Sequence, residues 1–265
     1  MDDTVFWGMM TAALILSARR GGKCARKGAF LSLSRLVVPS LSLSTASLRP
    51  SLTSLLKDPS LLPHIEGGKS VLFDVNDPSN NAVIAQIPVM GKSDAERAIQ
   101  KSYDTLPDWR DGTTAAARGN LLLKWSNLMQ ENADDLAVLM TLESGKPLAE
   151  SRGEVSYARS FLDYYSGEAI RSSGAGGGVI LPTPFASPSG SPRGQVMATQ
   201  QAIGVAALIT PWNFPSAMIT RKVGPALAAG CTAVVKPSEL TPLSAIALQT
   251  LAERAGIPPN VFQVV

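Results

Sequence analysis

Polar side chains that could do chemistry follow two apolar segments in the last part of the chain. The first segment, residues 203–210, leads into Asn213, which stands between two prolines and two aromatic residues. These neighbours stiffen the backbone, so the side-chain amide of Asn213 is a fixed donor that can stabilise negative charge on a substrate oxygen. The alternative is a turn residue whose amide bonds its own backbone.

The second apolar segment, residues 232–236, is followed by Ser238 and Glu239. A carboxylate a few residues past a strand end can accept hydrogen bonds from ribose hydroxyl groups, and its charge repels a 2′-phosphate. The ammonium group of Lys236 can donate to the same ribose. The alternative for Glu239 is a negative charge that the dipole of a helix N-terminus favours.

The composition argues against other classes of active site. The chain of 265 residues holds Cys24, Cys231 and His64 as its only cysteines and histidine. These three residues cannot form a Cys/His zinc site or a disulfide framework. A histidine-activated nucleophile would depend on His64, which lies in a Pro-rich stretch. We therefore expect neither metal chemistry nor a histidine-driven nucleophile.

Two glycine-containing segments lack the spacing of a phosphate loop. Ser144-Gly145-Lys146 has no upstream glycine and ends a predicted helix, so we interpret it as a helix C-cap. The glycine run at 174–178 is followed by Val179, where a dinucleotide fingerprint needs its third glycine, and no strand precedes it. Neither segment is expected to bind a nucleotide.

The elements that must position Asn213 and Glu239 alternate between strand and helix over residues 203–265. The nearly all-apolar run 203–210 is typical of a parallel strand buried on both faces, and further strands are predicted at 232–236 and 261–265. Helical patterns at 218–229 and 241–255 separate the three strands. This β-α-β-α-β order predicts an α/β protein with half of a doubly wound fold, whose ligands bind beyond the carboxyl ends of the strands.

Residues 58–171 are predicted to be mainly helical. A strand-like pair at 71–75 and 82–89 precedes a helix that runs toward Trp109, with Ser93 and Glu96 as its capping box. Three more helices are expected, one opened by Thr113 and Thr114, one from Asn132 to the stop at 145–147, and one at 148–172. We assign the charged and aromatic side chains of these helices to packing and predict no chemistry for them.

Residues 172–202 connect the two regions. Gly, Ser and Pro dominate 172–194, which predicts a low-complexity surface loop, and 195–201 has the pattern of an extended arm. We interpret this segment as a loop and oligomerisation arm.

The first 57 residues have the composition of a targeting peptide. They hold eight of the 24 basic residues but two of the 21 acidic ones, so the remaining residues carry a net charge of −3. An Arg-rich, Ser-rich and acid-poor segment is typical of a mitochondrial transit peptide and predicts a matrix protein. The alternative is a disordered tail. The acidic body disfavours a nucleic-acid partner, and no apolar run has the length of a membrane span.

The motifs around the two strand ends resemble the aldehyde dehydrogenase superfamily. They are Thr-Pro-Trp-Asn-Phe-Pro at 210–215, Lys-Val-Gly-Pro-Ala-Leu-Ala-Ala-Gly-Cys-Thr at 222–232, Val-Val-Lys-Pro-Ser-Glu at 234–239 and Glu-Ser-Gly-Lys-Pro-Leu at 143–148. The strings at 153–158, 216–225 and 244–248 are most similar to the succinate-semialdehyde dehydrogenase subgroup. The resemblance covers residues 66–265 and implies a Rossmann-like NAD-binding domain that is incomplete.

The resemblance implies roles for the residues after the first strand. Asn213 matches the asparagine whose side-chain amide forms an oxyanion hole together with a backbone amide. The stretch that lines the cofactor cleft in the family corresponds to Ile209, Thr210, Pro211 and Trp212.

The same resemblance implies how cofactor and substrate are held. Lys236 and Glu239 match the pair that holds the adenosine ribose, with Ser238 beside them, and a glutamate there favours NAD, with NADP possible. Arg221 occupies a position that faces the substrate tunnel, where a guanidinium can hold the distal carboxylate of succinate semialdehyde. The alternative for Arg221 is an exposed helix charge.

The family's nucleophilic cysteine and general-base glutamate both lie downstream of the second βαβ turn, and neither falls within these 265 residues. Cys231 matches a buried structural position and is a poor nucleophile. We therefore expect the amino-terminal portion of an NAD(P)-dependent succinate-semialdehyde dehydrogenase of 4-aminobutyrate degradation, inactive alone. The complete enzyme is expected to be a homo-oligomer that acts on a small aldehyde.

Two alternatives to this function remain. One is a non-catalytic partner subunit, or pseudoenzyme, that binds a full-length aldehyde dehydrogenase. The other is an aldehyde dehydrogenase for a different short aldehyde.

Overall fold

The computed structural model describes residues 52–62, 71–171, 177–183, 185, 188–191 and 194–265. The chain divides by its internal contacts into Met1–Ser47 and Leu48–Val265, and every described residue belongs to the second of these units. Most of the predicted leader, together with Cys24 and His64, lies outside the described residues.

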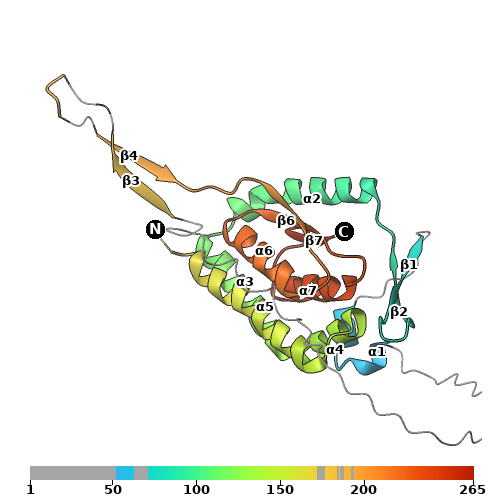
Figure 1. The fold of residues 1–265 in the computed structure, drawn as a ribbon. Helices are drawn as coiled ribbons and strands as arrows, with labels where there is room; N and C mark the ends of the chain where they lie inside the picture. Colours follow the sequence, from blue (N-terminus) through green and yellow to red (C-terminus); the bar gives the residue numbers. More distant parts are fainter. Residues whose placement is uncertain (1–51, 63–70, 172–176, 184, 186–187, 192–193) are drawn as a thin grey trace, which may run out of the picture. The chain divides into compact units, whose positions relative to one another are not determined.

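The predicted alternation of strand and helix forms a parallel sheet. Its strands are β5 (Val205–Ile209), β6 (Thr232–Lys236) and β7 (Phe262–Val264), in the order β5-β6-β7. Figure 1 labels β6 and β7. Both neighbouring pairs are parallel, and Ile209 lies opposite Lys236 at the carboxyl ends of β5 and β6. The helices α6 (Ala217–Ala228) and α7 (Pro242–Arg254) connect successive strands. The predicted β-α-β-α-β half is therefore confirmed.

The prediction that residues 203–210 are buried on both faces is wrong. Ala207 and Ile209 of β5 are exposed, Ile209 to 73%, whereas the first four residues of β6 are all buried. Strand β5 pairs with β6 and with no other strand of the described residues, and no described element covers the side chains of Ala207 and Ile209. An apolar run identifies a sheet strand but does not show which of its faces the neighbouring elements cover.

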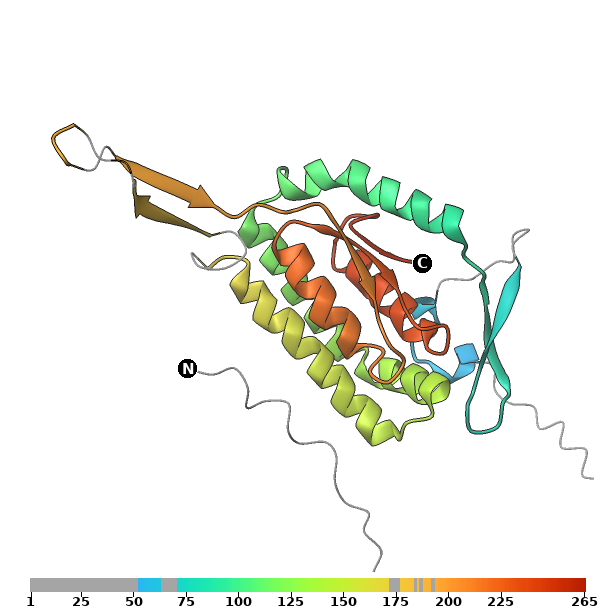
Figure 2. The ribbon, with the colours of Figure 1, turned by 45° about the horizontal axis from the view of Figure 1, so that its top comes forward.

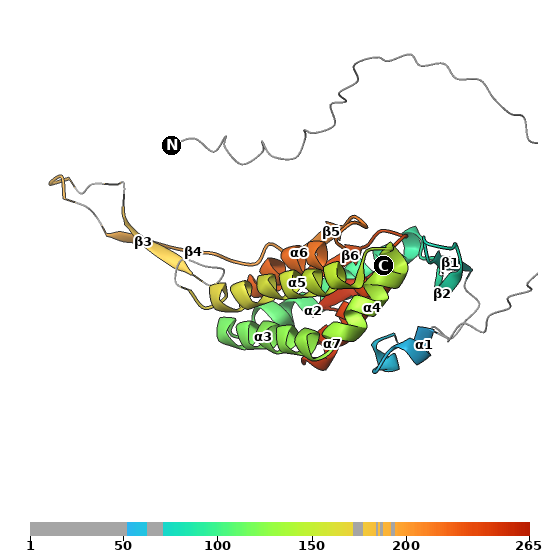
Figure 3. The same ribbon diagram turned by 60° about the horizontal axis from the view of Figure 1, so that its bottom comes forward.

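Four helices precede the parallel sheet in the chain. They are α2 (Lys92–Arg110), α3 (Ala115–Glu131), α4 (Ala133–Ser144) and α5 (Leu148–Glu168). Helix α2 contacts all three strands, and Figure 2 shows it on the side of the sheet opposite to α6 and α7. Helix α5 lies between α3 and α6, as Figure 3 shows, so the helical region packs directly on the strand–helix half.

The helix boundaries follow local capping signals. Thr114 is the N-cap of α3 as predicted, because its hydroxyl accepts a hydrogen bond from the Ala117 N–H at 3.1 Å. Gly145 ends α4 in the left-handed conformation, with φ 74°, so the predicted C-cap is confirmed. A side chain at Gly145 would also meet the ring of Pro78 at 2.8 Å.

The start of α2 and the end of α5 differ from the prediction. Helix α2 begins at Lys92, and the carboxylate of Asp94 accepts a hydrogen bond from the Gly91 N–H at 2.8 Å, which replaces the predicted cap by Ser93 and Glu96. Helix α5 ends at Glu168 and does not extend to residue 172.

Two antiparallel ribbons accompany the α/β unit. Strands β1 (Leu72–Asn76) and β2 (Val83–Pro88) form the predicted pair. Strands β3 (Gly178–Pro182) and β4 (Gln195–Thr199) form a second ribbon in which every residue is exposed. Strand β4 lies in the segment 195–201, which was predicted to be extended, whereas β3 lies within the segment interpreted as a loop. The glycine run before Val179 obscured the short apolar strand that follows it.

The segment before residue 63 contributes to the core. It contains the helical turn α1 (Leu52–Leu55) and a 3-10 turn at Pro59–Leu61, and the side chains of Leu56 and Leu61 are buried in the main cluster. The predicted leader boundary at residue 57 therefore falls inside a packed segment. No helix of the described ranges is long and apolar enough to cross a membrane.

Candidate functional site

The parallel register brings the two predicted segments to the same edge of the sheet. The Thr210 N–H donates a hydrogen bond to the Lys236 carbonyl oxygen at 3.2 Å, just where β5 and β6 end. The segment that carries Asn213 and the segment that carries Glu239 thus leave neighbouring strands at adjacent positions. This is the place where a doubly wound sheet binds its ligands.

A groove of about 720 Å³ opens beside the end of β6. Lys236, Ser238 and Glu239 line one part of it, and Gly91 and Lys92 at the start of α2 line another. Most of the other lining residues are apolar and come from β2, α7 and the end of β7. The groove therefore combines an apolar wall with a few charged groups at one edge, which is the usual character of a small-molecule site.

Lys236 and Glu239 form an exposed ion pair at the rim of this groove. The Lys236 Nζ lies 3.4 Å from the Glu239 Oε2. A hydrogen bond from its own backbone, and then the neighbouring ammonium group, hold the pKa of Glu239 below its ordinary value. The carboxylate is therefore ionised and accessible at neutral pH, as an acceptor for hydroxyl groups must be.

The other predicted cofactor residues do not line the groove. Thr210 is buried, and the side chains of Ile209 and Trp212 are exposed to 73% and 54%. Pro211 is also exposed. The structure thus brings Lys236, Ser238 and Glu239 together around one cavity and places residues 209–212 next to it, at the end of β5.

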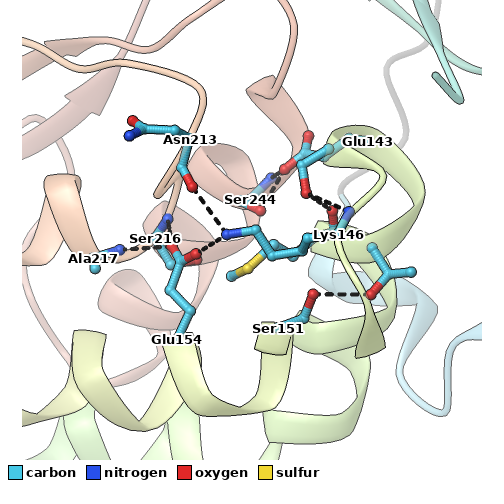
Figure 4. Close-up of polar contacts among 11 residues, drawn as sticks. Glu143, Lys146, Ser151, Glu154, Asn213, Ser216, Ala217 and Ser244 are labelled. Atoms are coloured by element: carbon cyan, nitrogen blue, oxygen red, sulfur yellow. Dashed lines mark hydrogen bonds and ion pairs between the residues drawn. The ribbon is translucent and has the colours of Figure 1, made fainter. Parts of the chain in front are cut away.

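Asn213 is exposed and is fixed through its backbone. Its carbonyl oxygen accepts a hydrogen bond from the Lys146 Nζ at 3.0 Å. Its side-chain amide forms no hydrogen bond with another described residue, and Figure 4 shows it pointing away from Lys146. The amide is thus available as a donor and does not bond its own backbone.

The lysine that holds the Asn213 carbonyl forms a buried ion pair with Glu154. The carboxylate of Glu154, whose side chain is 1% exposed, contacts the Lys146 Nζ with one oxygen. Its other oxygen accepts hydrogen bonds from the backbone N–H groups of Ser216 at 2.9 Å and Ala217 at 3.2 Å (Figure 4). Glu154 therefore binds the orphan donors at the start of α6, where the helix dipole favours a negative charge.

Glu143 accepts hydrogen bonds from the backbone N–H groups at the start of α7. Its buried carboxylate accepts hydrogen bonds from the Leu243 N–H at 2.7 Å, from the Ser244 N–H at 3.0 Å and from the Ser244 hydroxyl (Figure 4). Burial raises the pKa of Glu143 to about 7, although the three hydrogen bonds act in the opposite direction.

Sequence reasoning assigned Glu143 and Glu154 to helix packing and Lys146 to a helix C-cap, and it missed these contacts. Apart from the contact between Lys146 and Glu154, their partners lie 62 to 101 residues away along the chain. The available signal was the motif at 143–148. It places an acidic residue just before a helix stop and a lysine just after it. That motif contributed to the family resemblance but was not read as part of the site.

Three further predictions concern Arg221, Cys231 and metal binding. Arg221 lies on α6, is exposed, and forms no ion pair within the described part of the chain. Cys231 is a free, buried thiol, as expected for a structural position. No group of three His, Cys, Asp or Glu side chains in the described ranges is arranged to hold a metal ion.

Comparison with known proteins places these features in a family. The sequence pattern of the aldehyde dehydrogenase family matches residues 64–265. The chain is 52% identical over 201 residues to glutarate-semialdehyde dehydrogenase of Pseudomonas aeruginosa, covering 76% of this chain and 39% of that protein. It is 49% identical over 193 residues to mitochondrial succinate-semialdehyde dehydrogenase of Homo sapiens, covering 73% and 34%. It is 46% identical over 218 residues to 3-sulfolactaldehyde dehydrogenase of Pseudomonas putida, covering 79% and 43%.

Solved structures agree with the sequence comparison. An E. coli NADP-dependent enzyme matches with a TM-score of 0.71 and 46% identity, over 79% of this chain and 43% of that one. Betaine aldehyde dehydrogenase of Staphylococcus aureus in complex with NAD+ matches with a TM-score of 0.69 and 32% identity, over 76% and 38%. The chain spans about two fifths of the length of the relatives it matches. With its sequence match, its parallel sheet and its strand-end site, the chain belongs to the aldehyde dehydrogenase family.

Proposed function

We propose that the chain supplies the cofactor-binding part of an NAD(P)-dependent dehydrogenase that oxidises a short aldehyde with a distal anionic group. Succinate semialdehyde, giving succinate in 4-aminobutyrate degradation, is the first candidate substrate. The observation that carries this proposal is that the segments of Asn213 and of the Lys236–Glu239 pair leave the carboxyl ends of two neighbouring strands.

The groove beside β6 fits the adenosine part of the cofactor. Its volume of about 720 Å³ is in the range of small-molecule sites, and Ile87, Val89 and Ile246 offer an apolar wall for a base. Glu239 would accept hydrogen bonds from the ribose hydroxyl groups, and Lys236 would donate to them. NAD is proposed as the preferred cofactor because the charge of Glu239 opposes a 2′-phosphate. When bound, the nicotinamide accepts the hydride that leaves the aldehyde carbon.

Asn213 would donate a hydrogen bond to the oxygen of the reacting carbonyl group. Its exposed amide N–H₂ has no competing partner in the described structure, so it can donate to an oxygen that gains negative charge when a nucleophile attacks the aldehyde. The donor is effective only if its position is fixed before the reaction, because reorganising it would cost part of the stabilisation.

The names of the relatives support the class of substrate. Three relatives are each named for an aldehyde that carries a carboxylate or a sulfonate. They are succinate-semialdehyde, glutarate-semialdehyde and 3-sulfolactaldehyde dehydrogenase. Arg221 is the proposed partner of that distal anion, since it is exposed on the helix that follows Asn213 and its guanidinium has no ion pair in the described part of the chain.

Oligomerisation and location complete the proposal. The β3–β4 ribbon exposes Val179, Ile180, Leu181 and Met197, an apolar surface that a second copy of the chain would cover in a homo-oligomer. A mitochondrial location is proposed from the composition of the first 57 residues, and the human relative is named as a mitochondrial protein.

Cofactor titration tests the nucleotide site. We expect the full 265-residue chain to bind NAD at least about tenfold more tightly than NADP in isothermal titration calorimetry. Glu239→Gln removes the repulsion of the 2′-phosphate, so the preference falls to about threefold or less. Glu131→Gln, an exposed glutamate of α3 remote from the groove in sequence, keeps the wild-type preference. Equal binding of both cofactors by the wild type, or binding of neither, would contradict the proposal.

Substrate preference tests the anion site. We expect the native protein, captured from cells with an antibody against residues 113–150, to oxidise succinate semialdehyde with a kcat/KM about tenfold above that for butanal, its uncharged four-carbon counterpart. Arg221→Met should raise the KM for succinate semialdehyde about tenfold and leave that for butanal unchanged. Arg171→Met, which removes another exposed arginine, is the matched control. Similar rates on both aldehydes would point to a different short aldehyde.

A further inference from the structure

We propose that Lys146 is a positioning residue that fixes the loop 211–216 and, through it, the amide of Asn213. Lys146 acts on the backbone of this loop and touches no reacting atom. The inference rests on the proposed function for what Asn213 does, but the anchoring itself is a property of the chain without cofactor or substrate.

The ammonium group of Lys146 contacts the loop at two successive residues. Its Nζ donates a hydrogen bond to the Asn213 carbonyl oxygen at 3.0 Å and lies 4.8 Å from the centroid of the Phe214 ring. The first contact fixes the peptide plane that follows the Asn213 side chain, and the second is a cation–π contact. Together they locate the middle of the loop relative to the turn between α4 and α5.

The partner of Lys146 fixes the other end of the same loop. Glu154 contacts Lys146 with one carboxylate oxygen and binds the N–H groups of Ser216 and Ala217 with the other (Figure 4). One ion pair from the helical region therefore holds both the carbonyl of Asn213 and the start of α6. The loop between these points is short, and Pro211 and Pro215 limit its backbone freedom further.

The base of Lys146 is itself held rigidly. Gly145 has φ 74° and its N–H bonds the Thr141 carbonyl at 2.9 Å, and Pro147 has φ −57° just before α5. The Lys146 side chain is only 15% exposed. A lysine held in this way has a defined ammonium position, whereas an exposed lysine samples many rotamers.

The energetics favour a positional role over a stabilising one. An ion pair buried in this way adds little stability compared with apolar side chains of similar size, because desolvation offsets the attraction. The pair does supply a directional contact to Asn213. Trp212 and Asn213 have exposed side chains and form no side-chain hydrogen bond within the described residues, so Lys146 supplies the side-chain hydrogen bond that holds the Asn213 backbone.

The adjacent Trp212 gives a spectroscopic test of the anchor. The full chain is labelled with 5-fluorotryptophan, and the ¹⁹F resonance of Trp212 is assigned by its loss in Trp212→Phe. Two variants are compared. The first, Glu154→Gln, keeps Lys146 and keeps an acceptor oxygen for the N–H groups of α6. The second combines Glu154→Gln with Lys146→Met and differs from the first only by the loss of the ammonium group. The double variant carries no unpaired buried charge, so it folds even where Lys146→Met alone does not.

We expect the Trp212 resonance to stay in place in Glu154→Gln and to shift or split in the double variant. The resonances of the buried Trp109 and Trp125 stay in place in both and report an intact fold. Lys57→Met, which removes the exposed lysine paired with Asp134, is the matched control and leaves Trp212 unchanged. The inference is overturned if Trp212 is unchanged in the double variant, if both variants move it equally, or if the control moves it.

A kinetic comparison connects the anchor to the reaction. In the native protein the double variant should lower kcat about tenfold relative to Glu154→Gln and leave the KM for NAD within about twofold, because a misplaced donor affects the transition state and not the cofactor site. An unchanged kcat overturns the inference. A wild-type chain that binds no NAD would refute the proposed function instead, and the Trp212 comparison would still decide whether Lys146 anchors the loop.

Discussion

The free energy of unfolding is expected to fall by about 3 kcal/mol as the pH rises from about 4.5 to about 7, because of Glu143. This carboxyl is 3% exposed, and burial raises its pKa to about 7 from an ordinary value of 4.5. Between these two values the folded chain binds a proton that the unfolded chain has released. The contribution is therefore fully present below pH 4.5, is lost as the pH rises toward 7, and stays constant above that.

Urea unfolding at pH 5, 6, 7 and 8 measures this dependence. Glu143→Gln cannot titrate, so its unfolding free energy should be nearly independent of pH over the same range. Asp58, Asp134 and Glu239 have pKa values below the ordinary range, so their titration falls below this window. His64 is the single histidine, and histidine is the side-chain type that ordinarily titrates in this window, so His64→Asn is the control that must keep the slope.

A wild-type stability that is flat or rises between pH 5 and 7 would contradict the role assigned to Glu143. It would mean that the hydrogen bonds from Leu243 and Ser244 outweigh burial and keep the carboxylate ionised. In that case Glu143→Gln would destabilise the chain equally at every pH, because it would replace an acceptor of three hydrogen bonds with an amide that can clash with their donors.

The strand-end site was predictable because its signals are local. Apolar runs of about five residues ended by Pro and polar residues are sufficient to place Asn213 and Glu239 at the carboxyl ends of β5 and β6. The parallel register then follows from the intervening helices, since a strand that pairs in parallel with the strand before it requires a crossover. Thr114 and Gly145 were identified as helix caps because capping signals are also local in the sequence.

The contacts that were missed depend on where distant segments meet. Glu143 and Glu154 look like ordinary helix residues in sequence, and each becomes a helix cap only because another helix begins next to it in space. The exposure of Ile209 likewise depends on which elements pack over that face of β5. Periodicity carries no information on such pairings, so a buried acidic residue is found only when the fold is known.

Arg118→Met is expected to lower the free energy of unfolding by about 3 kcal/mol. The Arg118 side chain is buried, and its guanidinium donates to three backbone carbonyl groups: Thr113 at 2.9 Å, Ala228 at 3.1 Å and Arg110 at 3.4 Å. Ala228 ends α6 and Arg110 ends α2, so one side chain joins the C-termini of two helices from different halves of the fold. Methionine fills a similar volume but leaves these carbonyl groups without this donor.

The size of the effect follows from two opposing contributions. Each buried carbonyl that loses its donor costs about 1–3 kcal/mol, and the loss is partly offset because the guanidinium is no longer desolvated. That desolvation is already visible, since burial lowers the pKa of Arg118. Arg118→Lys should be intermediate, because a single ammonium group cannot reach three carbonyl groups in a fork.

Arg159→Met is the matched control for this prediction. Arg159 also donates to a backbone carbonyl, that of Ser126 at 2.9 Å, but its second partner is the exposed side chain of Gln130, and water can replace the arginine there. We expect a loss of about 1 kcal/mol or less in urea unfolding at pH 7. If Arg118→Met destabilises no more than Arg159→Met, the helix ends are satisfied without Arg118. The two halves of the fold would then be held together by apolar packing and by the caps that Glu143 and Glu154 provide.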